Sequence, residues 1–161
     1  GREVPRIENT GQHCRILVDV NATRQALLNV LSNAYKYSPC GGDVTIELNG
    51  PPGASTLCGV TVRDQGIGMT PEQLNHVGER FYRADKSGSI PGTGLGMAIV
   101  SGSLTLMGGA LDITSEPNVG TAVTLWFPRA LSLTDLQNPQ PEPEFDAELD
   151  DPQSLTTGDL T

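Results

Sequence analysis

The 161-residue sequence predicts an α+β fold: a two-layer sandwich in which helices cover one face of a mixed, mostly antiparallel sheet. Strand-like and helix-like segments follow one another in mixed order, and turns of hairpin length join several of the strands. Apolar residues make up 37% of the chain and aromatic residues only 4%, so we expect one domain with a mainly aliphatic core.

The first half of the chain contains three predicted strands and one long helix. Residues 14–20 (CRILVDV) favour a strand, and Asn21 is a suitable N-cap for a helix over residues 22–37. Residues 43–48 alternate between apolar and polar, as in a half-buried strand, and residues 57–63 (LCGVTVR) form the next strand.

The second half adds two helices and a closing hairpin. Residues 70–73 (TPEQ) carry a capping hydroxyl, a proline at the first helical position and a glutamine at the capping-box position, so they begin a short helix. Residues 84–92 are small, polar and rich in glycine, which predicts a mobile loop before a helix over residues 93–107. Strands over 110–115 and 121–127 close the domain.

Both ends of the chain differ from residues 14–128, which we expect to form the domain. Residues 1–13 are interpreted as a linker, and Gly1 indicates a piece of a longer protein. Residues 129–161 contain eight acidic side chains and one basic one, with too few apolar residues to fold, so we expect an acidic, disordered tail. That tail holds most of the net charge of −9.

The composition excludes several classes of function. The first 128 residues carry eleven acids and nine bases, so they offer no basic stripe to a nucleic acid. No apolar run approaches the roughly 20 residues that a membrane helix needs. Three cysteines without a CxxC pair predict free thiols in a reducing compartment and no zinc site.

The long helix presents an unusual polar face. At about 100° per residue, Asn29, Asn33 and Lys36 share one side, opposite an apolar stripe that includes Leu27 and Leu31. The face could simply be solvated. However, asparagine is a poor helix former, so two of them four residues apart suggest a function.

Two glycine-bearing segments could grip a ligand. Asp64 follows a strand and precedes Gly66 and Gly68, so a carboxylate acceptor stands beside backbone that a ligand can approach; the alternative is a turn with an incidental aspartate. Residues 92–96 (GTGLG) run into a helix N-terminus, which favours phosphate binding. A flexible polar loop precedes them instead of the buried strand of a Rossmann motif, and the Gly-Lys-Ser/Thr ending of a P-loop is absent.

The order and spacing of these segments resemble the catalytic ATP-binding domain of sensor histidine kinases. Five blocks match the N, G1, F and G2 boxes and the closing Gly-Thr strand of that family. They are residues 29–38 (NVLSNAYKYS), 64–69 (DQGIGM), 79–85 (ERFYRAD), 92–100 (GTGLGMAIV) and 118–125 (NVGTAVTL). The resemblance covers residues 14–128 and implies the Bergerat ATP-binding fold, shared with gyrase, a heat-shock chaperone and a mismatch-repair ATPase.

The resemblance also implies a catalytic group with ATP and Mg²⁺ as cofactors. Asn33 would bind Mg²⁺, with Asn29 as an auxiliary ligand. Lys36 would contact phosphate, Arg83 would reach the γ-phosphate, and Tyr37 would lie against the adenine–ribose edge.

Further residues would hold the nucleotide. Asp64 would accept a hydrogen bond from the adenine amino group, Thr121 would support it through water, and Gly66 and Gly68 would let the base sit close. Residues 84–92 would form a lid over the ATP. The phosphates would lie on Gly92, Thr93, Gly94, Leu95 and Gly96.

The acceptor and the type of reaction follow from the same resemblance. ATP-hydrolysing relatives carry a glutamate base where this chain has Asn29, so slow hydrolysis and transfer to a protein are expected. The acceptor histidine would lie on a separate dimerisation domain, because His13 and His76 are interpreted as incidental surface residues. The fragment would be a cytoplasmic monomer without nucleic-acid or membrane contact, part of a two-component system with a response regulator downstream.

Two other functions remain open from the sequence: an ATP-binding sensory or scaffold module without transfer, and an anti-sigma-type serine kinase on the same fold. Gly102 within the G2 helix departs from the family pattern.

Overall fold

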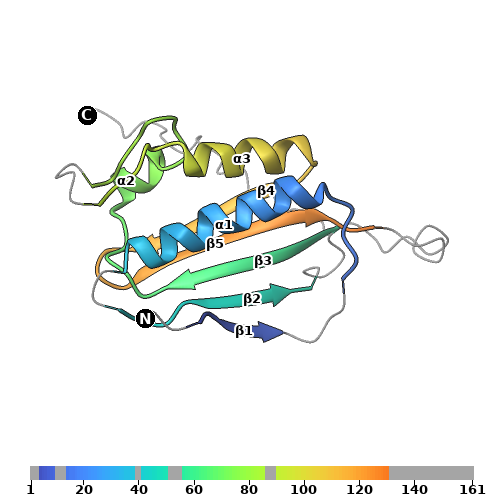
Figure 1. The fold of residues 1–161 in the computed structure, drawn as a ribbon, viewed down its shortest axis with the longest axis horizontal. Helices are drawn as coiled ribbons and strands as arrows, with labels where there is room; N and C mark the ends of the chain where they lie inside the picture. Colours follow the sequence, from blue (N-terminus) through green and yellow to red (C-terminus); the bar gives the residue numbers. More distant parts are fainter. Residues whose placement is uncertain (1–3, 10–13, 39–40, 51–55, 86–89, 131–161) are drawn as a thin grey trace, which may run out of the picture.

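A computed structural model describes residues 4–9, 14–38, 41–50, 56–85 and 90–130 (Figure 1). Several predictions fall partly or wholly outside these ranges: most of the linker with His13, the disordered tail, of which only Arg129 and Ala130 are described, and the middle of the proposed lid. The helices are α1 (Val20–Lys36), α2 (Pro71–His76) and α3 (Gly96–Leu106). The strands are β1 (Arg6–Asn9), β2 (Thr45–Asn49), β3 (Leu57–Asp64), β4 (Ala110–Glu116) and β5 (Gly120–Pro128).

The strands form one sheet in the order β1-β2-β3-β5-β4. Only the β1–β2 pair is parallel, so the predicted mixed, mostly antiparallel sheet is confirmed. Asp64 pairs with Thr121 across β3 and β5, and Thr121 pairs with Ser115 across β5 and β4. The three side chains therefore lie side by side at one end of the sheet.

Helices α1 and α3 lie together over one face of the sheet (Figure 1), which confirms the two-layer sandwich. Their buried stripes meet alternate residues of β3 and β5, because successive strand side chains point to opposite faces. The core is mainly aliphatic. The largest fully buried side chains are Phe127, Leu104, Leu125, Val30, Val62 and Val100.

The N-terminal region differs from its prediction in three places. Arg6–Asn9 is not a linker but an edge strand, β1, paired with β2. Residues 14–20 do not form a strand; Ile16 makes only an isolated bridge to Arg129, and the helix begins at Val20. Its cap is Asp19 rather than Asn21, because the Asp19 carboxylate accepts a 2.8 Å hydrogen bond from the Ala22 amide.

The other two helices begin as their local chemistry requires. Helix α2 has the predicted capping box between Thr70 and Gln73. Helix α3 begins at Gly96 rather than at residue 93, since Gly92 (φ 159°) and Gly94 (φ 72°) have non-helical backbone. A Cβ added to Gly102 would meet nothing within 4 Å, so packing does not require a glycine there.

Cys14 and Cys58 lie next to each other in the structure, with Cα atoms at the separation of a disulfide pair, whereas the sequence predicted unpaired thiols. The pair links the segment before α1 to the second residue of β3, and its two Cα atoms are 6.4 Å apart. Cys40 lies outside the described residues. Within the described part of the chain, no helix is long and apolar enough to cross a membrane.

Candidate nucleotide site

A cavity of about 770 Å³ lies between α1, α3, the loops around α2 and one end of the sheet. It brings together most of the residues predicted from the sequence: Asn29, Asn33, Lys36, Tyr37, Asp64, Gly68, Arg83, Gly92, Thr93, Gly94, Gly96 and Thr121. Gly66 and Leu95 are not among the lining residues. The apolar part of the wall includes Ile67, Met69, Val77, Met97 and Ile113. The cavity therefore offers both apolar and charged surface to a ligand.

The polar face of α1 lines this cavity, where Asn29, Asn33 and Lys36 are half-buried. The buried stripe of the helix is Ala26, Val30 and Ala34. It is rotated from the predicted one, and Asn29 and Asn33 therefore face the first turn of α3 along with the cavity.

Asn29 has a defined orientation. Its Oδ1 accepts a 3.4 Å hydrogen bond from Gln25 Nε2, one turn earlier. Its Nδ2 is buried and, among the described residues, has no hydrogen-bond partner. Because an unpaired buried donor is unfavourable, this amide is suited to an acceptor brought by a ligand.

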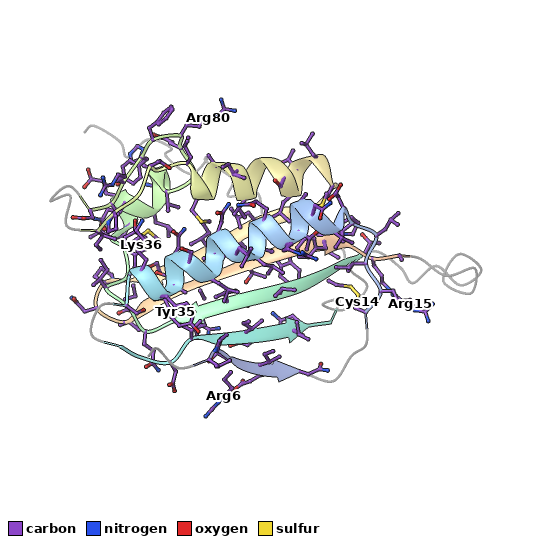
Figure 2. All side chains as sticks on the ribbon, viewed as in Figure 1. Arg6, Cys14, Arg15, Tyr35, Lys36 and Arg80 are labelled. Atoms are coloured by element: carbon purple, nitrogen blue, oxygen red, sulfur yellow. A yellow bond between two sulfur atoms is a disulfide. The ribbon has the colours of Figure 1, made fainter. Side chains whose placement is uncertain are left out.

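Two cations gather at the end of the cavity where α1 finishes. Lys36 stands there, at the end of the helix nearest α2 (Figure 2), with its Nζ 5.1 Å from the centre of the Tyr37 ring. Burial, and secondly the positive charge of Arg83, lower the pKa of Lys36, with Asp85 acting in the opposite direction. An anion bound between Lys36 and Arg83 would raise the pKa of Lys36 again, because a nearby opposite charge favours the charged form.

The base of the predicted lid is fixed by hydrogen bonds. The Arg83 guanidinium donates to the Ile90 carbonyl, and the Ile90 amide donates to Asp85 Oδ2 at 2.8 Å. Arg83 and Asp85 are also 3.8 Å apart as an ion pair. Residues 86–89, between these anchors, lie outside the described part of the chain.

Backbone geometry joins the F box to the G2 glycines. The Phe81 amide donates to the Gly94 carbonyl at 2.9 Å, and Phe81 adopts φ 67°, which is uncommon for a bulky residue. A Cβ at Gly94 would collide with this backbone. Helix α3 then starts with no side-chain hydrogen bond at its cap, Leu95. The amides of its first turn are left for an anionic ligand in the cavity.

Asp64 also lines the cavity, at the C-terminal end of β3, which we call the carboxylate end of the cavity, and it is only 8% exposed. Its Oδ1 accepts hydrogen bonds from the Gly66 amide at 2.8 Å and the Thr121 amide at 3.3 Å. Burial raises the pKa of this carboxyl, and the two amide bonds partly offset the rise. Among the described residues both bonds go to Oδ1, so Oδ2 is the oxygen left for an incoming donor.

The glycines of the G1 box have a steric reason within the protein itself. A Cβ at Gly66 would collide with the Tyr37 carbonyl, and one at Gly68 (φ 60°) would collide with the Glu116 carbonyl. These glycines let the loop pack against the end of α1 and the β4–β5 turn. Close approach of a base to Gly66 and Gly68 stays a prediction.

Ser115 belongs to the site although sequence reasoning missed it. Its hydroxyl contacts the Met69 amide at 2.9 Å, the Gly120 carbonyl at 3.0 Å and the Thr121 hydroxyl at 2.9 Å. The only available signal was a pair of hydroxyl residues at strand positions close to a hairpin turn.

Metal binding would depend on amide oxygens. Within the described residues, no three histidine, cysteine, aspartate or glutamate side chains are grouped to hold an ion. Asn33, beside Gly96 and the phosphate-suited end of the cavity, offers one neutral hard oxygen. Such a site would need further oxygens from the ligand.

Comparisons with known proteins agree with this geometry. Residues 18–131 match the family model described as "Histidine kinase-, DNA gyrase B-, and HSP90-like ATPase". Sensor histidine kinase WalK of Bacillus subtilis is 37% identical over 113 residues, which cover 69% of this chain and 18% of WalK. The histidine-protein kinase/phosphatase MprB of Mycolicibacterium smegmatis is 41% identical over 99 residues, 62% of this chain and 20% of that protein. The chain thus spans about a fifth of these curated relatives.

Solved structures give the same result. A mycobacterial sensor histidine kinase MprB structure superposes with a TM-score of 0.65 and 34% identity, covering 79% of this chain and 83% of that one. Full-length ShkA, solved in complex with AMPPNP, superposes with a TM-score of 0.68 and 30% identity, over 79% of this chain and 26% of that one. The chain belongs to the family of histidine kinase-, DNA gyrase B- and HSP90-like ATPases, as a catalytic ATP-binding domain of the sensor histidine kinase type.

Proposed function

We propose that this domain binds Mg-ATP and donates the γ-phosphoryl group to a histidine on a separate dimerisation domain. The observation that carries the proposal is the set of groups that line one cavity: a buried carboxylate, two cations and the N-terminus of α3, whose cap has no side-chain hydrogen bond. An adenine nucleotide has a donor on its base and anionic phosphates, so it matches both kinds of group.

The base would lie against the apolar wall, with its exocyclic amine on Asp64. Oδ1 already holds two backbone amides, so the amine would meet Oδ2. Met69 and Ile113 line the same cavity and would contact the adenine ring.

The phosphates would lie where Lys36, Arg83 and the first turn of α3 converge. Asn33 would supply one oxygen to Mg²⁺, and phosphate oxygens would supply others. Mg²⁺ neutralises developing negative charge between phosphate groups. The unpaired Asn29 Nδ2 would donate to an oxygen of the ligand, while Gln25 retains Asn29 Oδ1. In that orientation Asn29 would support the phosphates as a donor.

Transfer is favoured over hydrolysis by the chemistry of Asn29, because an amide cannot take a proton from water. The described histidine, His76, does not line the cavity; it is paired with Glu79 at 2.9 Å. An acceptor on a partner domain therefore fits better than His76. We place the reaction in the cytoplasm, with a response regulator as the next acceptor and a monomeric isolated domain.

The direct test mixes the chain with the dimerisation domain of its parent kinase and γ-labelled ATP. Label on the dimerisation domain that is lost in acid would indicate phosphohistidine. Acid-stable label would favour a serine kinase, and ATP binding without label would favour a scaffold.

Two variants identify the metal dependence. Asn33→Ala should abolish most of the gain in nucleotide affinity on adding Mg²⁺, whereas Asn75→Ala, an exposed asparagine on α2, should retain it. If Asn33→Ala binds with the full Mg²⁺ dependence, the metal ligand lies elsewhere.

A further inference from the structure

The Ser115 hydroxyl lies between three groups that shape the carboxylate end of the cavity. It joins the Met69 amide of the loop after β3, the Gly120 carbonyl at the start of β5 and the Thr121 hydroxyl of the same strand. Ser115 and Thr121 are directly opposite each other on β4 and β5. Thr121 lines the cavity, and Ser115 does not.

The three contacts fix the positions of the hydroxyl protons. A serine hydroxyl has one proton and two lone pairs. The Met69 amide can only donate and the Gly120 carbonyl can only accept, so Ser115 accepts from the first and donates its proton to the second. Its remaining lone pair must then accept from Thr121, since all three contacts can be satisfied in no other way.

The hydroxyl of Thr121 consequently donates its only proton to the Ser115 oxygen. Its oxygen can then act toward the cavity only as an acceptor. The neighbouring Asp64 carboxylate is also an acceptor, and the Thr121 amide, a donor, is already used by Asp64 Oδ1. Two acceptors from adjacent strands therefore face the same end of the cavity.

We propose that Ser115 is a specificity-determining positioning residue, which holds Thr121 as an acceptor and so selects purines with an amino group over purines with an oxo group at the same position. The inference rests on the proposed binding of a nucleotide in this cavity. An exocyclic amine donates to such a site, whereas a 6-oxo group would bring a third acceptor against two others.

The test measures a ratio of affinities. Titration calorimetry with Mg-ATP and Mg-ITP, whose base has a 6-oxo group and no 2-amino group, gives the preference of the wild-type chain. Ser115→Ala releases the Thr121 proton, so the hydroxyl can turn and donate to the oxo group. The preference for ATP over ITP should fall about fivefold, the effect of one hydrogen bond. Ser103→Ala on α3, outside the cavity, should leave the preference unchanged.

A double-mutant cycle separates this role from simple packing. Thr121→Val removes the hydroxyl with little change in shape, and it should lower the preference by itself, a result that does not depend on the folding of Ser115→Ala. Adding Ser115→Ala to Thr121→Val should have no further effect on the preference. Equal weakening of ATP and ITP by Ser115→Ala, or additive effects in the double variant, would overturn the inference while leaving ATP binding intact. A wild-type chain that binds neither nucleotide would instead overturn the proposed function, and this inference with it.

Discussion

The residues around the Asp64 carboxylate and the two cations of the cavity are held in different ways. At the carboxylate end, Asp64, Ser115 and Thr121 stand on paired strands and are connected by hydrogen bonds to backbone and to one another. At the cationic end, Lys36 comes from the last turn of α1, and Arg83 from the segment leading into residues 84–92. The groups around Asp64 already have the positions in which they would bind a base. The Arg83 guanidinium, in contrast, must change its hydrogen-bond partners before it can bind a phosphate.

This difference has a physical consequence for binding and reaction. Groups fixed by a sheet lose little conformational entropy when a ligand arrives, so they suit recognition. Arg83 must exchange its bonds to Ile90 and Asp85 for bonds to phosphate, which couples the charge of the ligand to the anchors of the lid. Changes at the two ends should therefore alter different measurements.

The largest expected effect is on transfer, from Arg83→Ala at the cationic end. Loss of the guanidinium should slow phosphoryl transfer about 100-fold, because charge stabilisation is the main catalytic contribution in such reactions. Arg80→Ala is the matched control, since Arg80 is exposed and extends away from the cavity (Figure 2). Single-turnover transfer to the dimerisation domain measures both variants. Equal rates for them would remove Arg83 from the reaction.

The next effect is on stability, at the carboxylate end. Gly68→Ala should lower the free energy of unfolding by about 3 kcal/mol, since the residue has φ 60° and its Cβ would meet the Glu116 carbonyl. Gly78→Ala, with nothing within 4 Å of the added atom, should be nearly neutral or stabilising. Urea unfolding followed by circular dichroism compares the two. A stable Gly68→Ala variant would contradict the packing role of this glycine.

Asp64→Asn should separate recognition from stability. Nucleotide affinity should fall about tenfold, because one oxygen that accepts from the amine becomes an amide donor. The unliganded domain should be at least as stable as wild type at neutral pH, because the buried charge disappears while asparagine Oδ1 still accepts from the Gly66 and Thr121 amides.

The difference in stability between Asp64→Asn and wild type should depend on pH. The pKa of Asp64 is raised, so the folded state holds this proton at a pH where the unfolded chain has released it. Its contribution to stability is complete below the ordinary carboxyl pKa and is lost as pH rises through the raised value. The stability advantage of Asp64→Asn over wild type should thus shrink on acidification. Urea unfolding of wild type and Asp64→Asn at several pH values measures this difference.

The smallest expected effect is on stability, from a substitution in α3 outside the cavity. Gly102→Ala should raise the free energy of unfolding by up to about 1 kcal/mol, since alanine is the better helix former and the added Cβ meets nothing within 4 Å. Nucleotide affinity should not change, because Gly102 does not line the cavity. Thermal melting with and without ATP checks both statements, and a lower melting temperature would contradict the open packing at this position.

The residues that line the cavity could be predicted from the sequence better than the contacts that hold them in place. Asn33, Asp64 and Gly92 carry recognisable chemistry at recognisable spacing, and they line one cavity. Strand β1 was missed because all four of its residues are exposed, so no alternation of apolar and polar residues marks it. Residues 14–20 looked like a strand from composition, but strand pairing is a long-range property that composition does not supply.

The supporting hydrogen bonds were beyond prediction for the same reason. Nothing local indicates that Ser115 will stand opposite Thr121 or that the Asp85 carboxylate will hold the Ile90 amide. Likewise, the glycines of residues 66–68 indicated a close approach, and only the fold reveals that the partner is backbone from α1 and from the β4–β5 turn.

That turn sets a limit on how the domain can be modified. Surface hairpins usually accept insertions and fused tags. Here the Asn118 amide donates to the Ile67 carbonyl at 2.8 Å, and Glu116 lies directly on Gly68. A peptide inserted between residues 116 and 120 would pull on the loop beneath it, so this exposed corner is a poor place for an epitope or a reporter.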